Sequence, residues 1–341
     1  MTDIKQVAVL GGGSFGTVLA NLAASNGHEV RLWVRDADQA LRINSEGVNT
    51  SYHPELQLSE NISASEDLGG VVNGAEYILV ATPSSIFNNI IPRLEPHIDS
   101  SAFVISCTKG IQPDPFSTMT EIISKHLGHV IGDKVGALSG PNLAKEIADQ
   151  KIAGTVIASI NKTLSYEIKT ILSSNTFKVF SSADTQGVEL AGALKNIYAI
   201  CCGIAHAKNV GENALGFIVT RSMAEMSRFA VAKGANPITF LGLAGMGDLM
   251  ATCTSKLSRN FQLGELLGAD MSLKEAKAKV GQVAEGARTL EVVFLEAKKM
   301  DVSMPMVDSL YKILYEDSSS DELIQDLLDH PNEVDVEFTY K

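Results

Sequence analysis

The sequence lacks several features that would indicate other classes of protein. Basic residues are few: 28 Lys and Arg stand against 40 Asp and Glu, which gives a formal net charge of −12. This balance argues against a nucleic acid as the main partner, so a phosphate-bearing ligand must be held by a few local cations and helix ends. No apolar run reaches the ~18 residues that span a bilayer, so we expect no membrane insertion.

Cysteine is also scarce, and the four cysteines show no C-x-x-C spacing. Cys201 and Cys202 are adjacent in an apolar run, which favours core thiols over a disulfide framework. His126 and His129 are three residues apart, but no nearby cysteine or carboxylate cluster completes a metal site, so we predict no metal. Because MTDIKQVAVLGGG runs directly into a strand, we expect no signal peptide and a cytoplasmic location.

What the sequence does contain is a complete unit of strand, glycine-rich turn, helix and strand near its start. Val7–Leu10 is an apolar run typical of a buried parallel strand, and Glu29–Val34 is predicted as the next strand. Between them lie a helical run and a turn with Gly11, Gly13 and Gly16. In such units the glycines permit the tight turn, approach to a pyrophosphate and close helix packing. The pyrophosphate lies against N–H groups at the helix N-terminus, so this context predicts dinucleotide binding.

Arg35 follows the second predicted strand, where an acid usually binds the ribose 2′-OH. An acid would repel the 2′-phosphate of NADP, whereas an arginine accommodates it. Asp36 is the next residue and could still serve NAD. We therefore expect both NADPH/NADP and NADH/NAD as cofactors, with NADPH preferred.

Strands and helical segments continue to alternate along the first half of the chain. Further strands are predicted at Tyr77–Ala81, Phe103–Ser106, Val135–Leu138, Thr155–Ser159 and Thr176–Phe180. This order predicts an α/β fold with a parallel, doubly wound sheet, and ligand contacts just after the strand ends. From Thr185 the sequence becomes helix-rich. We expect a dinucleotide-binding domain at residues 1–184 and a helical substrate and catalytic domain at residues 185–341.

Two turns after predicted strands carry groups suited to an anionic or hydroxylated ligand. Lys109 follows the strand FVIS, at the carboxyl edge of the sheet. The turn SGPN, which contains Gly140 and Asn142, follows VGAL and leads into the helical run LAKEIA. A solvated loop cation and a simple capped helix are the alternative interpretations.

Lys195 is the most suggestive single residue because it interrupts an apolar helical run, GVELAGALKNIYAICCGIA. Long charged side chains are rarely buried without a partner. Burial lowers the pKa of a lysine towards the range that acid–base catalysis at a carbonyl requires. The alternative is a lysine whose amine reaches solvent at the helix rim.

Two further segments supply polar groups to the second half of the chain. The glycine-rich run LGLAGMGDLMAT is interpreted as a loop leading to Asp248, whose carboxylate could pair with a buried lysine. Ser258, Arg259 and Asn260 open the helical run FQLGELLG. A hydroxyl, a guanidinium and an amide at a helix start suit a phosphate, and an ordinary N-cap is the alternative.

Together these segments resemble bacterial NAD(P)-dependent glycerol-3-phosphate dehydrogenase. The matching runs are GGGSFGT, CTKGI, SGPNLAKEIA, ELAGALKNIYAI, GLAGMGDLMATC, SRNFQLG and GQVAEG. They extend over nearly the whole chain, and ALKN and GDL…SRN are the most specific. The resemblance implies a Rossmann-type N-terminal domain and a C-terminal all-α domain like that of 6-phosphogluconate dehydrogenase. It also implies a homodimer and the interconversion of dihydroxyacetone phosphate and sn-glycerol 3-phosphate, which supplies phospholipid synthesis.

The resemblance assigns roles to individual positions. Lys195 matches the proton donor and acceptor, and Lys109 and Asp248 complete the catalytic set. The implied cofactor contacts, beside the three turn glycines, are Ser14, Phe15, Arg35, Lys109, Ala144, Arg259, Val283 and Glu285. The implied substrate contacts are Lys109, Gly140, Asn142, Lys195, Asp248, Ser258, Arg259 and Asn260. Phe15 stands where the family often has Trp or Tyr, and Asn142 where a hydroxyl residue is frequent.

Two other functions fit parts of this pattern. A related two-domain hydroxyacid dehydrogenase would act on a carboxylate substrate, but the helix start at Ser258 favours phosphate. A non-catalytic NAD(P) sensor would not need Lys195 in an apolar helix. Oxidation of NADPH with dihydroxyacetone phosphate, compared with a panel of keto acids, separates the three.

Overall fold

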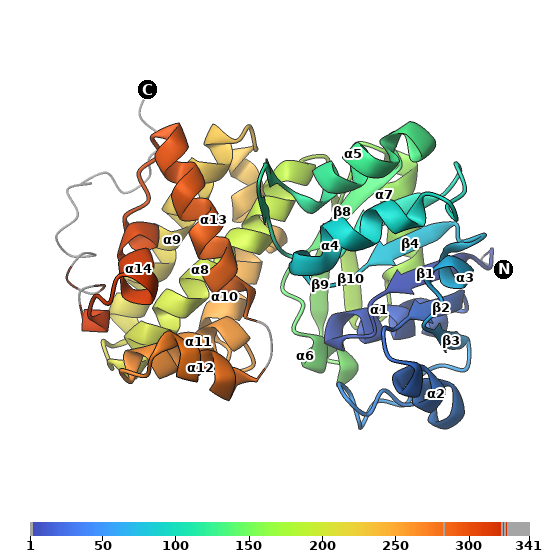
Figure 1. Ribbon diagram of the computed structural model, residues 1–341, viewed down its shortest axis with the longest axis horizontal. Helices are drawn as coiled ribbons and strands as arrows, with labels where there is room; N and C mark the ends of the chain where they lie inside the picture. The colour runs from blue at the N-terminus through green and yellow to red at the C-terminus, as the bar shows by residue number, and fades with distance from the viewer. Residues whose placement is uncertain (1–2, 282–283, 322, 324, 326–341) are drawn as a thin grey trace. The chain divides into compact units, whose positions relative to one another are not determined.

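The computed structural model describes residues 3–281, 284–321, 323 and 325 (Figure 1). The chain forms two compact units. Unit 1 comprises Met1–Gln112 and Ser117–Glu189, and unit 2 comprises Pro113–Phe116 and Leu190–Lys341. The sequence-based boundary between residues 184 and 185 lies at the start of α8 (Thr185–Ala207), the helix that runs through this division.

Unit 1 is built on an eight-stranded sheet in the order β10-β9-β8-β5-β4-β1-β2-β3. Its strands are β1 (Gln6–Leu10), β2 (Glu29–Trp33), β3 (Ile62–Ser65), β4 (Tyr77–Val80), β5 (Phe103–Ser106), β8 (Val135–Ser139), β9 (Ala153–Ala158) and β10 (Phe177–Ser182). From β8 to β3 all neighbouring pairs are parallel, and the order reverses between β1 and β4. The predicted doubly wound, Rossmann-type sheet is confirmed, and its ligand crevice is expected beyond the carboxyl ends of β1 and β4.

One part of the predicted sheet is wrong, because its last two strands do not run with the others. β9 pairs antiparallel with β8, and β10 is parallel to β9. The connection from β8 contains only α6 (Ala144–Ala148), five residues long. At ~1.5 Å per residue this helix is too short to return the chain along the strand. α7 (Lys162–Leu172) is long enough and makes the β9–β10 crossover. The edge strand β3 was not predicted, because ISAS is short and half polar.

Alternating side chains of the strands build two cores, one on each face of the sheet. Val7 and Val9 of β1 pack with α1 (Ser14–Ser25), α2 (Ala37–Glu46), α6 and α7. Ala8 and Leu10 pack on the opposite face with α3 (Leu68–Val72), α4 (Ser84–Ile90), the 3₁₀ turn η1 (Ile91–Leu94) and α5 (Met119–Ile131) (Figure 1). This two-residue period on a sheet covered on both sides explains why β1 is apolar throughout. Because helices cover both faces of the sheet, the loops at the strand ends are where we expect ligands to bind.

The described part of unit 2 is helical apart from a short hairpin. The hairpin pairs β6 (Gln112–Pro113) with β7 (Phe116–Ser117). After α8 the elements are α9 (Glu212–Ala232), η2 (Pro237–Leu241), η3 (Leu243–Gly247), α10 (Asp248–Thr254), α11 (Arg259–Gly268), α12 (Leu273–Val280), α13 (Glu285–Met300) and α14 (Pro305–Tyr315). The predicted all-α character of the region is confirmed.

α8 is the central helix of unit 2, and two glycines bring it against α11. A Cβ on Gly203 of α8 would lie 2.1 Å from the carbonyl oxygen of Phe261, and one on Gly264 of α11 would lie 2.1 Å from that of Ile200. Only glycine permits this backbone contact. It brings the beginning of α11 beside the middle of α8, where Lys195 lies.

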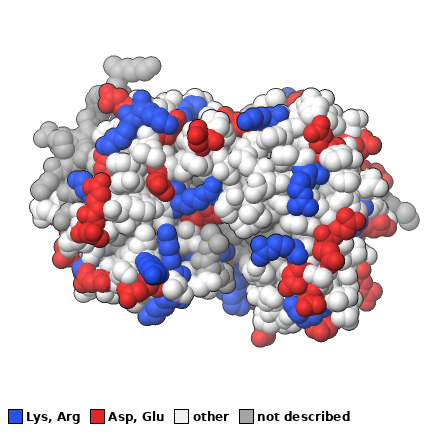
Figure 2. Space-filling model, viewed as in Figure 1, with Lys and Arg blue, Asp and Glu red and all other residues white. Residues whose placement is uncertain are grey.

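Two features of the molecule bear on the expected partners. Among the described residues, α8 alone is long and apolar enough to cross a membrane, but its most apolar stretch is entirely buried, as in the core helix of a globular protein. On the face shown in Figure 2, basic and acidic side chains are interspersed over both units. This face therefore presents no extended basic surface for nucleic acid.

Candidate functional site

The glycine turn between β1 and α1 has the form expected of a dinucleotide site. A Cβ on Gly16 would lie 1.9 Å from the carbonyl oxygen of Gly11, so Gly16 is required for packing. A Cβ on Gly13 would meet nothing within 4 Å, and the N-cap of α1 has no side-chain hydrogen bond. The space beside Gly13 and the helix N-terminus behind it fit a pyrophosphate.

A polar network that the sequence did not indicate holds this turn in place by hydrogen bonds. The carbonyl oxygen of Gly12 accepts hydrogen bonds from Gln39 Nε2 at 2.7 Å and from Asn49 Nδ2 at 3.0 Å. His53, which is 6% exposed, lies 3.0 Å through Nε2 from the hydroxyl of Ser14. These side chains come from the polar segment after β2, and fix a turn that is far from them in the sequence.

Arg35 and Asp36 have different surroundings at the end of β2. Within the described residues the exposed guanidinium of Arg35 makes no hydrogen bond or ion pair. The Oδ1 atom of Asp36 accepts a hydrogen bond from the N–H of Asp38 at 2.9 Å and caps α2. Asp36 thus has a structural role, whereas Arg35 is available for a ligand.

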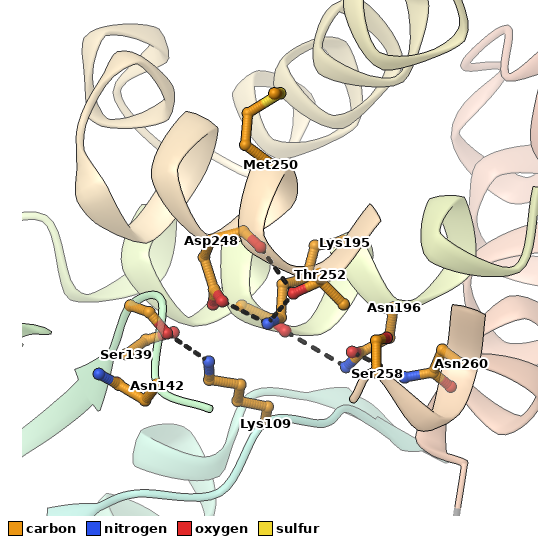
Figure 3. A network of polar contacts seen from close by, with 12 residues as sticks. Lys109, Ser139, Asn142, Lys195, Asn196, Asp248, Met250, Thr252, Ser258 and Asn260 are labelled. Atoms are coloured by element: carbon orange, nitrogen blue, oxygen red, sulfur yellow. Dashed lines mark hydrogen bonds and ion pairs between the residues drawn. The ribbon is translucent and has the colours of Figure 1, made fainter. Parts of the chain in front are cut away.

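The turns that follow β5 and β8 are brought together, because these strands are neighbours. Lys109, which is half-buried, donates from Nζ to the carbonyl oxygen of Gly140 at 2.7 Å (Figure 3). The Asn142 amide donates to the carbonyl oxygen of Gly154 at 3.1 Å and accepts from the hydroxyl of Thr155 at 2.9 Å. Lys109, Gly140 and Asn142 therefore form one cluster, in which the side chain of Asn142 braces the start of β9.

The other predicted cofactor contacts are located as follows. Phe15 at the start of α1 and Ala144 at the start of α6 pack against the same core, and the two helices are in contact. Glu285 is the first residue of α13 and is half-buried. Val283 lies outside the described residues.

Lys195 lies in a buried cluster with an acid and a hydroxyl (Figure 3). Its Nζ forms a short hydrogen-bonded ion pair with Asp248 Oδ1, and their side chains are only 8% and 1% exposed. Nζ also donates to the hydroxyl of Thr252 at 2.6 Å, and that hydroxyl donates to the carbonyl oxygen of Asp248 at 2.6 Å. An ammonium has three N–H donors, so these two contacts fix its position and leave one donor for another ligand. Thr252 was not predicted.

The segment that carries Asp248 is not the loop expected from its glycines. η3 is a π-helical turn and leads directly into α10, which begins at Asp248. A Cβ on Gly245 would lie 2.2 Å from the carbonyl oxygen of Phe240, so the glycine permits close packing and does not mark a loop. Because the segment is helical, Asp248 and Thr252 lie one turn apart on the same face.

The start of α11 lies beside this cluster and is well ordered by its own hydrogen bonds (Figure 3). Ser258 caps α11 by accepting from the N–H of Phe261 at 3.2 Å, which is the ordinary N-cap role. The Asn260 amide donates to Asn196 Oδ1 at 2.9 Å and accepts from the N–H of Gly286 at 2.9 Å. Arg259, the first residue of α11, is exposed. Asn260 therefore connects α8, α11 and α13. Asn196 is a further residue of this site, and it was not predicted.

Two buried carboxyl groups lie outside these clusters. Burial raises the pKa of Glu225 to about 7, although its carboxylate accepts hydrogen bonds from the N–H of Met306 at 2.8 Å and from the hydroxyl of Tyr198 at 3.1 Å. Burial likewise raises the pKa of Glu189 to about 7, against hydrogen bonds from Thr120. Both acids stabilise a helix N-terminus, those of α14 and α5, which is a favourable position for a carboxylate.

No reactive thiol or metal cluster was found in the part of the chain that the structure describes. The four cysteines are buried and free, as predicted, and burial raises the pKa of the Cys107 and Cys201 thiols. Over residues 3–281, 284–321, 323 and 325, no group of three His, Cys, Asp or Glu side chains could hold a metal ion.

Comparison with protein families gives two matches that follow each other along the chain. Residues 6–165 match the N-terminal part of NAD-dependent glycerol-3-phosphate dehydrogenase. Residues 184–325 match its C-terminal part. Both halves of the chain are therefore covered.

Individual proteins of this name are similar over nearly the whole chain. A glycerol-3-phosphate dehydrogenase [NAD(P)+] from Alcanivorax borkumensis is 48% identical over 339 residues, 99% of this chain and 98% of that protein. One from Acinetobacter baumannii is 46% identical, with 98% and 92% covered. The crystal structure of glycerol-3-phosphate dehydrogenase from Coxiella burnetii has a TM-score of 0.90 and 35% identity, and covers 96% of this chain and 99% of that one.

Proposed function

Because the chain belongs to the NAD-dependent glycerol-3-phosphate dehydrogenase family, we propose that it interconverts dihydroxyacetone phosphate and sn-glycerol 3-phosphate with NAD(P)H. It is an NAD(P)-dependent oxidoreductase. The observation that carries the proposed chemistry is the buried cluster of Lys195, Asp248 and Thr252. A solvent-excluded lysine with two fixed hydrogen-bond partners is a preorganised proton donor.

The residues of unit 1 fit the cofactor. The open space beside Gly13 fits its pyrophosphate, and Ser14 and Phe15 at the start of α1 line the same turn. We assign further contacts to Lys109, Ala144, Arg259, Val283 and Glu285. When bound, the reduced nicotinamide supplies the hydride for the substrate carbonyl carbon.

Lys195 would donate a proton to the alkoxide oxygen in the reductive direction and accept it in the oxidative direction. Asp248 and Thr252 hold the ammonium, so its orientation is set before the substrate arrives. Lys109 places positive charge near the substrate oxygens, with Gly140 and Asn142 as further substrate contacts. Charge fixed in advance is commonly the largest contribution to catalysis.

Ser258, Arg259 and Asn260 would bind the substrate phosphate at the start of α11. The N–H groups and the dipole of a helix N-terminus favour an anion, and Arg259 adds a charge-assisted donor. Ser258 and Asn260 already have hydrogen-bond partners in unit 2, so their geometry is preorganised. Binding at this remote group would help to hold the carbonyl carbon in place for reduction.

Arg35 supports a preference for NADPH. Its guanidinium is exposed and unpaired within the described residues, which suits the 2′-phosphate, while Asp36 caps α2.

We further propose that the product supplies phospholipid synthesis, that the location is the cytoplasm and that the protein forms a homodimer. Sedimentation of the purified protein tests the last point.

The test is oxidation of NADPH by the purified protein with dihydroxyacetone phosphate, against a panel of 2-keto and 3-keto acids. We expect turnover with the phosphorylated ketone and little with the acids. Preference for a keto acid would support the rival hydroxyacid dehydrogenase, and binding of NADPH without turnover of any ketone would support a sensor.

A further inference from the structure

Two residues of one short loop contact the first turn of α1, and all of these residues belong to unit 1. Asn49 and His53 lie between α2 and β3 and are joined by a single antiparallel bridge. The N–H of His53 donates to the carbonyl oxygen of Asn49 at 2.8 Å. The two residues are almost fully buried, at 1% and 6% exposure. The loop is therefore a fixed element beside the glycine turn.

Asn49 holds the backbone of the turn and the helix that follows it. Its Nδ2 donates to the carbonyl oxygen of Gly12 at 3.0 Å and to the hydroxyl of Thr17 at 2.8 Å. That hydroxyl donates to the carbonyl oxygen of Gly13 at 2.8 Å. These bonds end on backbone oxygens or on a fully buried hydroxyl. Asn49 therefore maintains the shape of the turn and presents no group to a ligand.

His53 differs from Asn49 because it contacts a side chain that is only half-buried, that of Ser14. Its Nε2 lies 2.9 Å from the carbonyl oxygen of Ser14 and 3.0 Å from the Ser14 hydroxyl. A carbonyl oxygen can only accept, so Nε2 carries a proton and donates to it. The hydroxyl can then only accept from the same N–H. Its own hydrogen is therefore directed away from the ring.

The Ser14 hydroxyl lies where a bound pyrophosphate is expected. Ser14 is the first residue of α1, and the first N–H groups of a helix have no partner within it. It follows Gly13, where a Cβ would meet nothing within 4 Å. A pyrophosphate on this turn lies against the N–H groups. A hydroxyl hydrogen turned away from His53 can donate to the same phosphate oxygens, and hydrogen bonds to charged acceptors are the strong ones.

We propose that His53 is a positioning residue for the cofactor, whose Nε2–H holds the Ser14 hydroxyl so that it donates to the pyrophosphate. The inference rests on the dinucleotide site of the proposed function. Because NAD and NADP share the pyrophosphate, the effect of His53 is equal for both, unlike that of Arg35. The alternative is that His53 only stabilises its loop.

The test measures the Kd of His53→Phe for NADPH, NADH and ADP-ribose, which all contain the pyrophosphate. Phenylalanine keeps a planar ring and removes the donor. We expect each Kd to rise by the same factor, roughly 5- to 10-fold, the scale of one hydrogen bond. The KM for dihydroxyacetone phosphate at saturating NADPH should be unchanged. His53→Gln, whose amide reaches about as far as Nε2, should keep the wild-type values.

The matched control is His28, a second buried histidine of unit 1, which is 3% exposed. Its Nδ1 accepts from the N–H of Lys5 at 3.2 Å. These two residues directly precede β2 and β1, so they lie at the amino edge of the sheet, away from the glycine turn. His28→Phe also loses a hydrogen bond, but it should leave all three Kd values unchanged.

A double-mutant cycle with Ser14→Ala separates positioning from loop stability. If His53 acts through the hydroxyl, His53→Phe causes no further rise in Kd in the Ser14→Ala background. If His53→Phe does not fold, His53→Asn provides the same cycle, because the shorter asparagine amide does not reach the position of Nε2.

Additive rises in Kd, an unchanged Kd in His53→Phe, or an equal rise in His28→Phe would overturn the proposal. A wild-type protein that binds NADPH without reducing dihydroxyacetone phosphate would overturn the proposed reaction but not this inference, which is measured by binding. A wild-type protein that binds no dinucleotide would overturn both.

Discussion

Asp248 offers a quantitative prediction about the lysine cluster. Its carboxylate pairs with Lys195 where both side chains are almost fully buried, at 1% and 8% exposure. Replacing Asp248 with Leu removes one charge and leaves the other without a counterion. Little water reaches the ammonium to compensate, because the Lys195 side chain is only 8% exposed. The hydroxyl of Thr252 keeps its own acceptor, the backbone carbonyl oxygen of residue 248.

The size of the effect follows from burial. Breaking a buried pair by removing one partner costs about 3–5 kcal/mol, whereas replacing both with apolar residues is often neutral. At roughly 2–4 °C per kcal/mol for a unit of this size, Asp248→Leu should lower the unfolding midpoint by about 10 °C. The double variant Asp248→Leu/Lys195→Met should be closer to the wild type than Asp248→Leu is.

Thermal unfolding of the wild type, both single variants and the double variant measures this cycle. All four chains are compared at one protein concentration without cofactor, because bound ligand stabilises the folded state. A double variant that loses as much as the two single variants combined would refute the reasoning, since it would show that the two charges do not stabilise each other.

Three further predictions test other parts of the molecule. Arg35→Ala should weaken the Kd for NADPH roughly 10- to 100-fold, the scale of a lost charge-assisted hydrogen bond, and leave that for NADH nearly unchanged; equal losses in titrations would contradict the assignment of Arg35. Gly13→Ala should keep the unfolding midpoint but weaken dinucleotide binding, whereas Gly16→Ala should destabilise the fold, because only the second Cβ meets backbone at 1.9 Å; a normal Kd in Gly13→Ala would count against the pyrophosphate site. Burial raises the pKa of Glu189 and Glu225 from their ordinary 4.5 to about 7, so the folded state binds these protons more tightly than the unfolded state does. The free energy of unfolding should therefore decrease as the pH rises from 4.5 to 7. Glu225→Gln should reduce that fall, as measured by unfolding midpoints at pH 5 and 8, and an unchanged fall would exclude Glu225 as a source.

The parts of the fold that depend on local pattern could be predicted from the sequence. β1, the glycine turn and β2 are contiguous, so their spacing and apolarity specify the unit directly. The direction of β9 could not be predicted in this way. It depends on the length of α6, and LAKEIA indicates a helix without showing that it ends after one turn.

The candidate site could be predicted in part for the same reason. Lys195 is conspicuous because it is charged within an apolar helix, and an acid was expected to pair with it. Thr252 was missed because its place beside Lys195 requires the segment from Leu243 to be helical, and its glycines suggested a loop. Gln39 and Asn49 were missed because polar residues after a strand give no local sign of contact with a turn 27 or more residues away.

The central claim is that Lys195 transfers the proton, and Lys195→Met tests it most directly. Methionine keeps an unbranched side chain of similar length and removes the charge. We predict a fall in turnover of NADPH with dihydroxyacetone phosphate of at least ~100-fold, the scale of a lost acid–base group, with a nearly unchanged Kd for NADPH. Near-normal turnover in a folded Lys195→Met protein would contradict the mechanism.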